Sequence, residues 1–335
     1  MKAFLLLLVV GLAAAAPTSK EDEDIVIDEE FYPSEWVKYT SEHDIVSLLV
    51  PINSLNFDEN DSSESNSKEE DVDVVLFFSE ADIIDGKKDY KGVSVIKKNK
   101  VTKLLENGRD MAASGDDSKL VFIGASDGIY VYKDEKTAVE KYGSINDDIY
   151  GIAKEKDGDI MYILTANKEV FKVSDNGNKK EKLEGVKAEQ MVLDYSNNLY
   201  FSDSDKQVYV RTSEGIKKIE GLPANPKFIQ LLRPAFVMDD MVPVVVDETS
   251  YLAYSNGTSE TGDITFKKPK YRPTAYSMEA AIIQYYAIDK HIYEYNMLAI
   301  LLGTMLEEIK NFLGNQKSTI EEISSSRKAS VRKYV

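Results

Sequence analysis

The chain has 335 residues, a formal net charge of −17 and no cysteine. An acidic surface repels a phosphate backbone, so these numbers exclude sequence-independent nucleic-acid binding. The absence of cysteine excludes disulfides, thiolate metal sites and thiol nucleophiles. Only His43 and His291 could supply an imidazole, which leaves little room for a zinc site or a histidine-based triad.

Residues 1–16 have the pattern of a secretory signal peptide. Lys2 precedes an apolar run from Ala3 to Val10, and small residues follow this run. The run is too short for a membrane-spanning helix. We therefore expect a secreted, extracellular protein with no membrane partner, and the sequons at Asn60 and Asn256 are compatible with glycosylation on that route.

Two segments precede the regular part of the chain. Residues 17–57 begin as an acidic arm and regain aromatic and aliphatic residues from Phe31 onward, which predicts a segment that packs on the body. Residues 58–73 carry eight acidic side chains and one apolar side chain, Val72. This stretch lacks the carboxylate spacing of a calcium loop, and it offers nothing to offset the entropy of ordering, so we expect a disordered acidic insert.

A strand-turn-strand pattern recurs along the middle of the chain. It is clearest from Ala188 to Arg211, where β-branched, aliphatic and aromatic residues alternate with turns rich in Asp, Ser and Asn. Hairpins of the same kind occupy residues 119–132, 159–173 and 198–211. Aligning the first strand of each unit makes four residues equivalent at spacings of 40, 40 and 37 residues: Asp110, Tyr150, Gln190 and Lys227.

Repetition at this period predicts an all-β fold, a β-propeller of six blades spanning residues 74–296. Residues 74–108 fit the outer part of an earlier blade, and residues 228–267 and 274–296 fit a fifth and a sixth. Closing such a ring needs an additional strand, and the apolar stretch 44–52 is the donor that we predict.

The period changes near the end of the chain. Apolar residues from Met297 to Phe312 recur at steps of three and four, which predicts an amphipathic helix within a C-terminal helical segment, residues 297–323. We expect this helix to cap the propeller. Residues 324–335 form a basic tail.

No short catalytic motif is present, which leaves three function classes open. A divalent-metal-dependent hydrolase of the lactonase or esterase type would use dispersed carboxylates and amides at the channel. The candidates for such a set are Asp110, Asp148, Glu189, Gln190 and Asn225. An extracellular interaction propeller without a small ligand is another alternative, because propellers host many functions.

The third class, which we favour, is a monomeric, non-catalytic binder of a small planar aromatic ligand. The chain has 20 tyrosines, and Tyr150, Tyr276, Tyr285 and Tyr286 fall at or near inner strands or blade edges. We predict that the four equivalent residues Asp110, Tyr150, Gln190 and Lys227 lie at the channel mouth. Tyr150 would face the ligand's ring and Lys227 an anionic group, with no catalytic residue, cofactor or metal assigned.

The N-terminal pattern, the acidic start after it and the repeated phrases at 145–173 and 185–211 resemble insect ommochrome-binding proteins of moths and butterflies. More distantly, the chain resembles six-bladed propellers of the regucalcin and low-density-lipoprotein-receptor types. The resemblance covers roughly residues 71–267. It implies a secreted protein that binds an ommochrome-like pigment without catalysing a reaction, and it transfers no pigment-contact residue. The acidic insert, the long N-terminal segment and the C-terminal helix depart from the family pattern.

Overall fold

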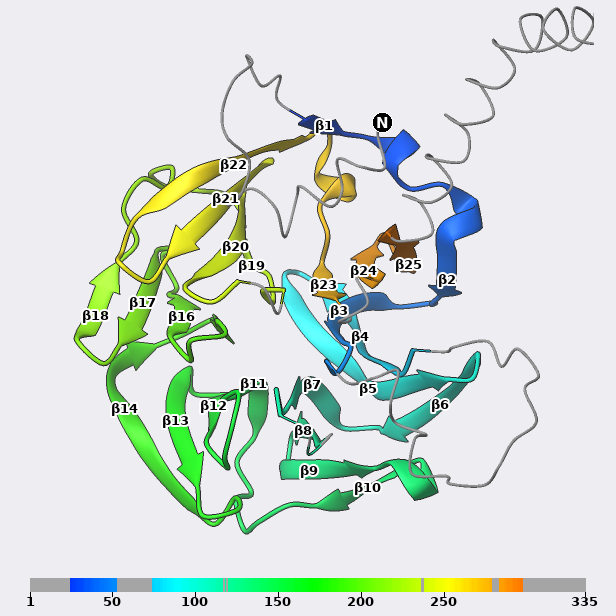
Figure 1. The fold of residues 1–335 in the computed structure, drawn as a ribbon, viewed down its shortest axis with the longest axis vertical. Helices are drawn as coiled ribbons and strands as arrows, with labels where there is room; N and C mark the ends of the chain where they lie inside the picture. The colour runs from blue at the N-terminus through cyan, green and yellow to red at the C-terminus, as the bar shows by residue number, and fades with distance from the viewer. Residues whose placement is uncertain are drawn as a thin grey trace, which may run out of the picture.

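Six sheets, antiparallel except for one parallel strand pair at an outer edge, surround a central axis and form a six-bladed β-propeller, which confirms the predicted all-β fold and the number of blades (Figure 1). The computed structural model describes residues 25–52, 74–116, 118, 120–235, 238–278 and 283–297. The predicted signal peptide, Asn60, the acidic insert, the basic tail and the C-terminal helical segment beyond Met297 lie outside the described residues.

The blades follow one another along the chain, each with its innermost strand first. Blades one and two contain β3 (Asp44–Leu49), β4 (Leu76–Ile84), β5 (Lys87–Lys97) and β6 (Lys100–Leu105), then β7 (Gly108–Ala113), β8 (Val121–Ala125), β9 (Gly128–Lys133) and β10 (Ala138–Lys141). Blades three and four contain β11 (Ile149–Lys154), β12 (Met161–Thr165), β13 (Glu169–Ser174) and β14 (Lys179–Lys187), then β15 (Gln190–Leu193), β16 (Leu199–Ser202), β17 (Val208–Thr212) and β18 (Gly215–Lys218).

The last two blades recruit strands from the N-terminal segment. Blade five contains β19 (Ile229–Leu231), β20 (Met241–Val246), β21 (Thr249–Tyr254), β22 (Ser259–Phe266) and, at its outer edge, β1 (Ile25–Ile27). Blade six contains β23 (Ala275–Met278), β24 (Ile283–Ile288), β25 (His291–Asn296) and β2 (Val37–Thr40). Within the described residues, short 3-10 turns connect these strands: η2 (Glu29–Phe31), η3 (Ser34–Trp36), η5 (Asp134–Lys136) and η6 (Pro269–Tyr271).

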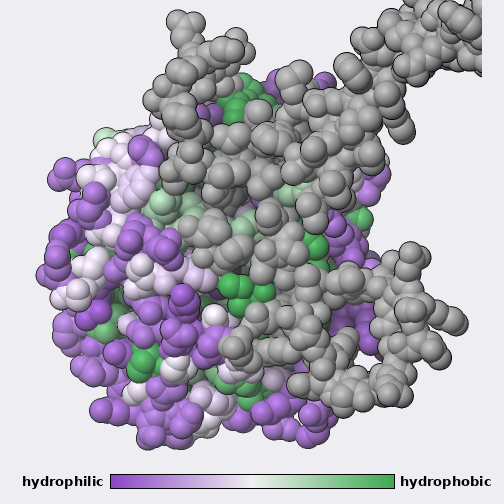
Figure 2. Space-filling model, viewed as in Figure 1, coloured by the Kyte–Doolittle hydropathy of each residue, from purple (hydrophilic) through white to green (hydrophobic). Residues whose placement is uncertain are grey.

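Burial within a blade follows the distance from the axis. All five residues of β8, a second strand, are buried, because both of its faces pack against neighbouring blades. The outermost β14 is mostly exposed and rich in lysine, as expected for an edge that must resist pairing with other chains. Polar residues accordingly dominate the outer parts of the blades that Figure 2 shows in colour.

The N-terminal strand β2 closes the ring, so the prediction that residues 44–52 donate the closing strand is wrong. Strand β2 pairs antiparallel with β25, Val37 opposite Tyr293, and forms the outermost strand of blade six. Residues 44–49 instead form the innermost strand of blade one, where Ile45 and Leu48 are each 1% exposed. This difference has a physical reason, because an apolar run needs the burial that only the inner part of a blade offers.

Strand β1 lies in the segment that we expected to be an acidic arm, and the sequence did not predict it. Its three residues pair in parallel with β22, Ile25 opposite Ile264, and its Ile27 is 3% exposed. The N-terminal segment is therefore bound to both of the last two blades. Across the described part of the chain, we find no helix of the length and apolar character needed to cross a membrane.

Candidate functional site

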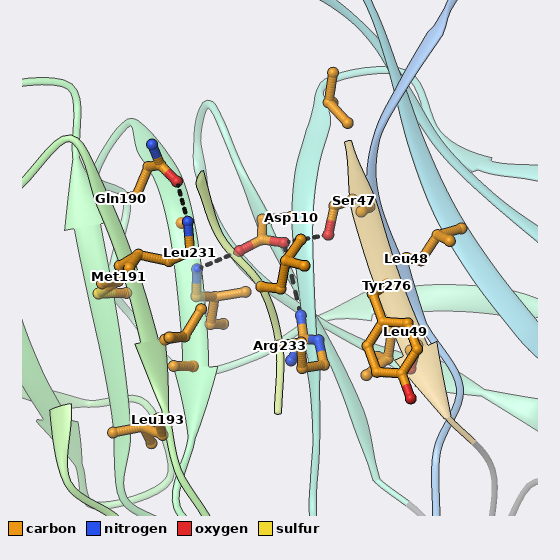
Figure 3. A pocket seen from close by; sticks show the side chains of 18 of the residues that line it. Ser47, Leu48, Leu49, Asp110, Gln190, Met191, Leu193, Leu231, Arg233 and Tyr276 are labelled. Carbon is orange, nitrogen blue, oxygen red and sulfur yellow. Dashed lines mark hydrogen bonds and ion pairs between the residues drawn. The ribbon is translucent and has the colours of Figure 1, made fainter. Parts of the chain in front are cut away.

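A cavity of about 560 Å³ lies where the six innermost strands converge. Every blade contributes to its wall through its first strand, and residues of the β4–β5 hairpin, including Lys88 and Tyr90, add to the lining. Figure 3 shows this cavity with Asp110 and Arg233 near its centre and Gln190 and Tyr276 on its wall. Because the cavity is common to all blades, it is the candidate binding site of the fold.

Three of the four residues that the alignment made equivalent line the cavity, namely Asp110, Tyr150 and Gln190, but they do not occupy equivalent positions in their strands. A register irregularity in each of three innermost strands displaces one residue: Val46 in β3, Arg109 in β7 and Tyr150 in β11. The residue after each irregularity occupies the common position, which makes Ser47, Asp110 and Gly151 equivalent. Tyr150 is thus the counterpart of Arg109 rather than of Asp110, because a bulge inserts one extra residue into a strand.

Asp110 joins three blades. One carboxylate oxygen accepts a hydrogen bond from the hydroxyl of Ser47 in blade one at 2.6 Å. The other accepts one from the backbone amide of Ile152 in blade three at 2.9 Å. Both oxygens of this predicted site residue are therefore engaged by neighbouring innermost strands, and Asp110 ties the ring together at the axis.

Gln190 makes an equivalent connection between blades four and five. Its side-chain amide donates to the carbonyl of Ile229 at 2.9 Å and accepts from the amide of Leu231 at 3.0 Å. The Gln190 side chain thus bonds a carbonyl and an amide of the same strand in the neighbouring blade, as a paired backbone would, and links the two sheets. Gln190 lines the cavity, but its polar atoms already have partners.

Tyr150 belongs to a cation-π cluster in the wall. The Arg109 guanidinium lies 4.1 Å from the Tyr150 ring centre and 5.4 Å from that of Tyr90. Arg109 also forms an ion pair with Asp148 at 2.5 Å. Tyr150 remains 40% exposed, so one of its surfaces is available to a ligand. The cluster offers aromatic faces next to a fixed positive charge.

Arg233 crosses the centre of the cavity. It follows β19 of blade five, and its Nη2 donates to the carbonyl of Met111 in blade two at 2.7 Å. Blades two and five stand opposite each other in a ring of six, so this guanidinium lies near the axis. Nη2 is also 4.0 Å from a carboxylate oxygen of Asp110.

The cavity concentrates positive charge in a strongly acidic protein. Its described lining contains six basic side chains and three acidic ones. The basic residues are Lys87, Lys88, Arg109, Lys154, Lys156 and Arg233, and the acidic residues are Asp110, Glu189 and Asp194. Burial lowers the pKa of Lys154, which lies 8% exposed and donates to the carbonyl of Glu155 at 2.7 Å.

Asp194 loses its negative charge at mildly acidic pH. It is 3% exposed and accepts hydrogen bonds from the amides of Ser196 and Asn198 and from the Asn198 side chain. Burial raises the pKa of Asp194 to about 6, because desolvation outweighs these hydrogen bonds. At mildly acidic pH the excess of positive charge in the cavity therefore increases.

Several other predicted residues lie elsewhere. Lys227 is not among the residues that line the cavity; it is exposed ahead of β19, where its backbone amide donates to Asp247 at 2.9 Å. Tyr285 and Tyr286 belong to the second strand of blade six and are buried in the packing between strands, at 0% and 5% exposure. Tyr276, by contrast, lies in the cavity wall.

Sequence reasoning missed Arg109 and Arg233. Arg109 directly precedes Asp110, and only the bulge shows that it shares a position with Tyr150. Arg233 follows the first strand of the fifth unit, at a position that no repeated pattern marks. A lone arginine among apolar residues, in Leu231-Leu232-Arg233-Pro234, was the one available signal.

The set of residues considered for a divalent metal does not converge. Among the described residues, no group of three or more His, Asp or Glu side chains is placed to hold an ion. Asp148 pairs with Arg109, Glu189 pairs with Lys168, and Asn225 is absent from the cavity lining. Asn256 is exposed in a turn, and its Oδ1 accepts from the amide and the hydroxyl of Thr258.

Comparison with known proteins yields a likeness of fold alone. No family model and no curated protein matches the chain. Among solved structures, it is similar to virginiamycin B lyase from Staphylococcus aureus, with 15% identity, a TM-score of 0.47 and coverage of 76% of this chain and 85% of the lyase. Hydrazine synthase of Kuenenia stuttgartiensis gives 10% identity, a TM-score of 0.47 and coverage of 75% of each chain. The extracellular domain of a hybrid two component system from B. thetaiotaomicron gives 14% identity, a TM-score of 0.46, and coverage of 77% of this chain and 39% of that one.

Proposed function

We propose that this protein is a secreted, non-catalytic binding protein for a small planar aromatic ligand that carries negative charge, and that the ligand occupies the central cavity. The observation that carries this proposal is the excess of six basic over three acidic side chains around a cavity in a chain of net charge −17. A concave site of about 560 Å³ has room for a ligand of this class.

The aromatic part of the proposal rests on Tyr90 and Tyr150. Their rings are 5.9 Å apart and nearly perpendicular, with the Arg109 guanidinium against both. Exposed tyrosine rings stack on planar ligands at a low entropic cost, and an adjacent arginine favours an anionic substituent. An ommochrome-like pigment or a related metabolite is the ligand class that the sequence resemblance suggests.

A binding role also agrees with the state of the carboxylates in the wall. Asp110 is bonded to Ser47 and Ile152, Glu189 pairs with Lys168, and Asp194 is buried in its own turn. A general base needs a carboxylate within reach of a substrate, whereas these groups already serve the scaffold.

The proposal is tested by an absorbance spectrum of protein purified from its native source, followed by titration of the stripped protein with the recovered chromophore. We expect an absorption band beyond that of tyrosine and tryptophan. Replacing Tyr150 with alanine should weaken binding by about three- to ten-fold, the range expected for one lost aromatic contact.

Lys227→Ala is the matched control, because Lys227 is exposed and outside the cavity lining. Its affinity should equal that of the wild type. A protein with no chromophore and no thermal shift with any planar aromatic acid would instead support an interaction propeller without a small ligand.

A further inference from the structure

The guanidinium of Arg233 has unused hydrogen-bonding capacity at the axis of the propeller. An arginine side chain carries five N–H donors. In Arg233 one bond goes to the Met111 carbonyl, and the nearest oxygen of Asp110, at 4.0 Å, is beyond hydrogen-bonding distance. Its Nε is buried and has no partner. A buried N–H without an acceptor costs free energy, so its presence requires an explanation.

Tyr276 presents a second unpartnered donor in the same cavity. This residue is 1% exposed, lines the cavity from blade six, and has a hydroxyl with no hydrogen-bond partner. In Figure 3, Tyr276 and Arg233 both lie below Asp110. Both lie near Tyr195. Burial raises the pKa of Tyr195, and the nearby Arg233 guanidinium partly offsets that rise. Burial also raises the pKa of Tyr276, with a smaller contribution from Tyr195.

The protonation states make both groups donors at any physiological pH. Burial holds the pKa of Tyr276 well above its ordinary value, and burial raises the pKa of Tyr195 to about 12. A neutral phenol and a guanidinium can both donate to one anionic oxygen pair, and charge-assisted bonds of this kind are the stronger ones. Two unpartnered donors that line one cavity therefore favour an anion as the missing acceptor.

We propose that Arg233 and Tyr276 form a carboxylate subsite near the propeller axis, so that the ligand is an aromatic carboxylic acid that enters acid-first. This inference rests on the proposed function, whose aromatic contact lies at Tyr90 and Tyr150. Arg233 is prepared for the role because its bond to Met111 across the ring fixes the guanidinium before a ligand arrives.

Two planar probes of nearly the same shape, one anionic and one neutral, test the subsite: quinoline-2-carboxylate and its amide, quinoline-2-carboxamide. Each is titrated by calorimetry into the wild type, Tyr276→Phe and Arg233→Met. We expect both substitutions to weaken the carboxylate by about ten-fold or more and to change the amide by less than about three-fold. Tyr276→Phe should leave the melting temperature equal or higher, because it removes an unpartnered buried hydroxyl.

Lys227→Met is the matched charge control. Lys227 is exposed and outside the cavity lining, so its loss removes the same unit charge without touching the axis. It should weaken the carboxylate by less than about three-fold. If Tyr276→Phe and Arg233→Met bind the carboxylate as the wild type does, or lose both probes equally, the subsite is wrong while aromatic binding stands. If the wild type binds neither probe, the proposed function fails and the subsite fails with it.

Discussion

The stability of this protein should depend on pH through Asp194. This residue is 3% exposed, and its oxygens accept from the Ser196 amide at 3.0 Å, the Asn198 amide at 2.8 Å and the Asn198 side chain at 2.9 Å. Desolvation penalises its charged form and raises its pKa to about 6. The substitution Asp194→Asn removes the titration and keeps the size of the side chain.

The magnitude follows from the difference between the folded and unfolded pKa. An unfolded aspartate titrates near 3.9, so the shift is about two units, or about 3 kcal/mol at 1.36 kcal/mol per unit. The folded state binds the proton more tightly. Stability contributed by this group is therefore fully present below about pH 4, is lost as the pH rises to about 6, and is constant above that.

Urea unfolding of both proteins from about pH 4 to about pH 7 measures the effect. Other carboxylates, such as Asp82 and Asp127, have lowered pKa values and shift the stability of both proteins alike. The free energy of unfolding of the wild type minus that of Asp194→Asn should fall by up to about 3 kcal/mol across the window. An altered hydrogen bond to Asn198 adds only a constant offset. A difference that is flat, or that increases with pH, would refute the buried and desolvated state of this carboxyl.

Three further predictions concern the scaffold. Asp110→Ala should lower the free energy of unfolding by about 3 kcal/mol or more, because it leaves a hydroxyl and an amide of two neighbouring blades without their acceptor. The control Asp110→Asn should cost less, and equal losses in urea unfolding would contradict the inter-blade role. Gly128→Ala should lower the free energy of unfolding by about 3 kcal/mol, because Gly128 has φ +126° and a Cβ there would collide with the Ile145 carbonyl oxygen. The control Gly158→Ala, where φ is +72° and the space is open, should cost about 1 kcal/mol. A similar melting temperature for both variants would count against the close approach at Gly128. A chain that begins at Ser41 lacks β1 and β2 and should lose about 5 kcal/mol or fail to fold, and an unchanged thermal transition would show that β2 does not close the ring.

Local sequence was sufficient to predict the blades because their signals are short-range. Each hairpin carries its own alternation and its own turn residues, as at Asp289-Lys290, and the fold repeats that unit. The same reasoning placed Asp110, Tyr150 and Gln190 in the cavity wall. It failed at Lys227, because the first strand of the fifth unit begins at Ile229 and no local pattern marks that offset.

The sequence by itself determined the all-β fold, the tandem hairpins and the number of blades, since strand and turn propensities act over a few residues. Only the tertiary structure decided that Val37–Thr40 closes the ring, because the partner of a strand depends on which strand edge elsewhere in the fold remains unpaired. It also decided which residues face the axis, since single-residue bulges shift Arg109 and Tyr150 out of register. The bond from Arg233 to Met111 joins residues 122 positions apart, and such proximity exists only after the ring has closed.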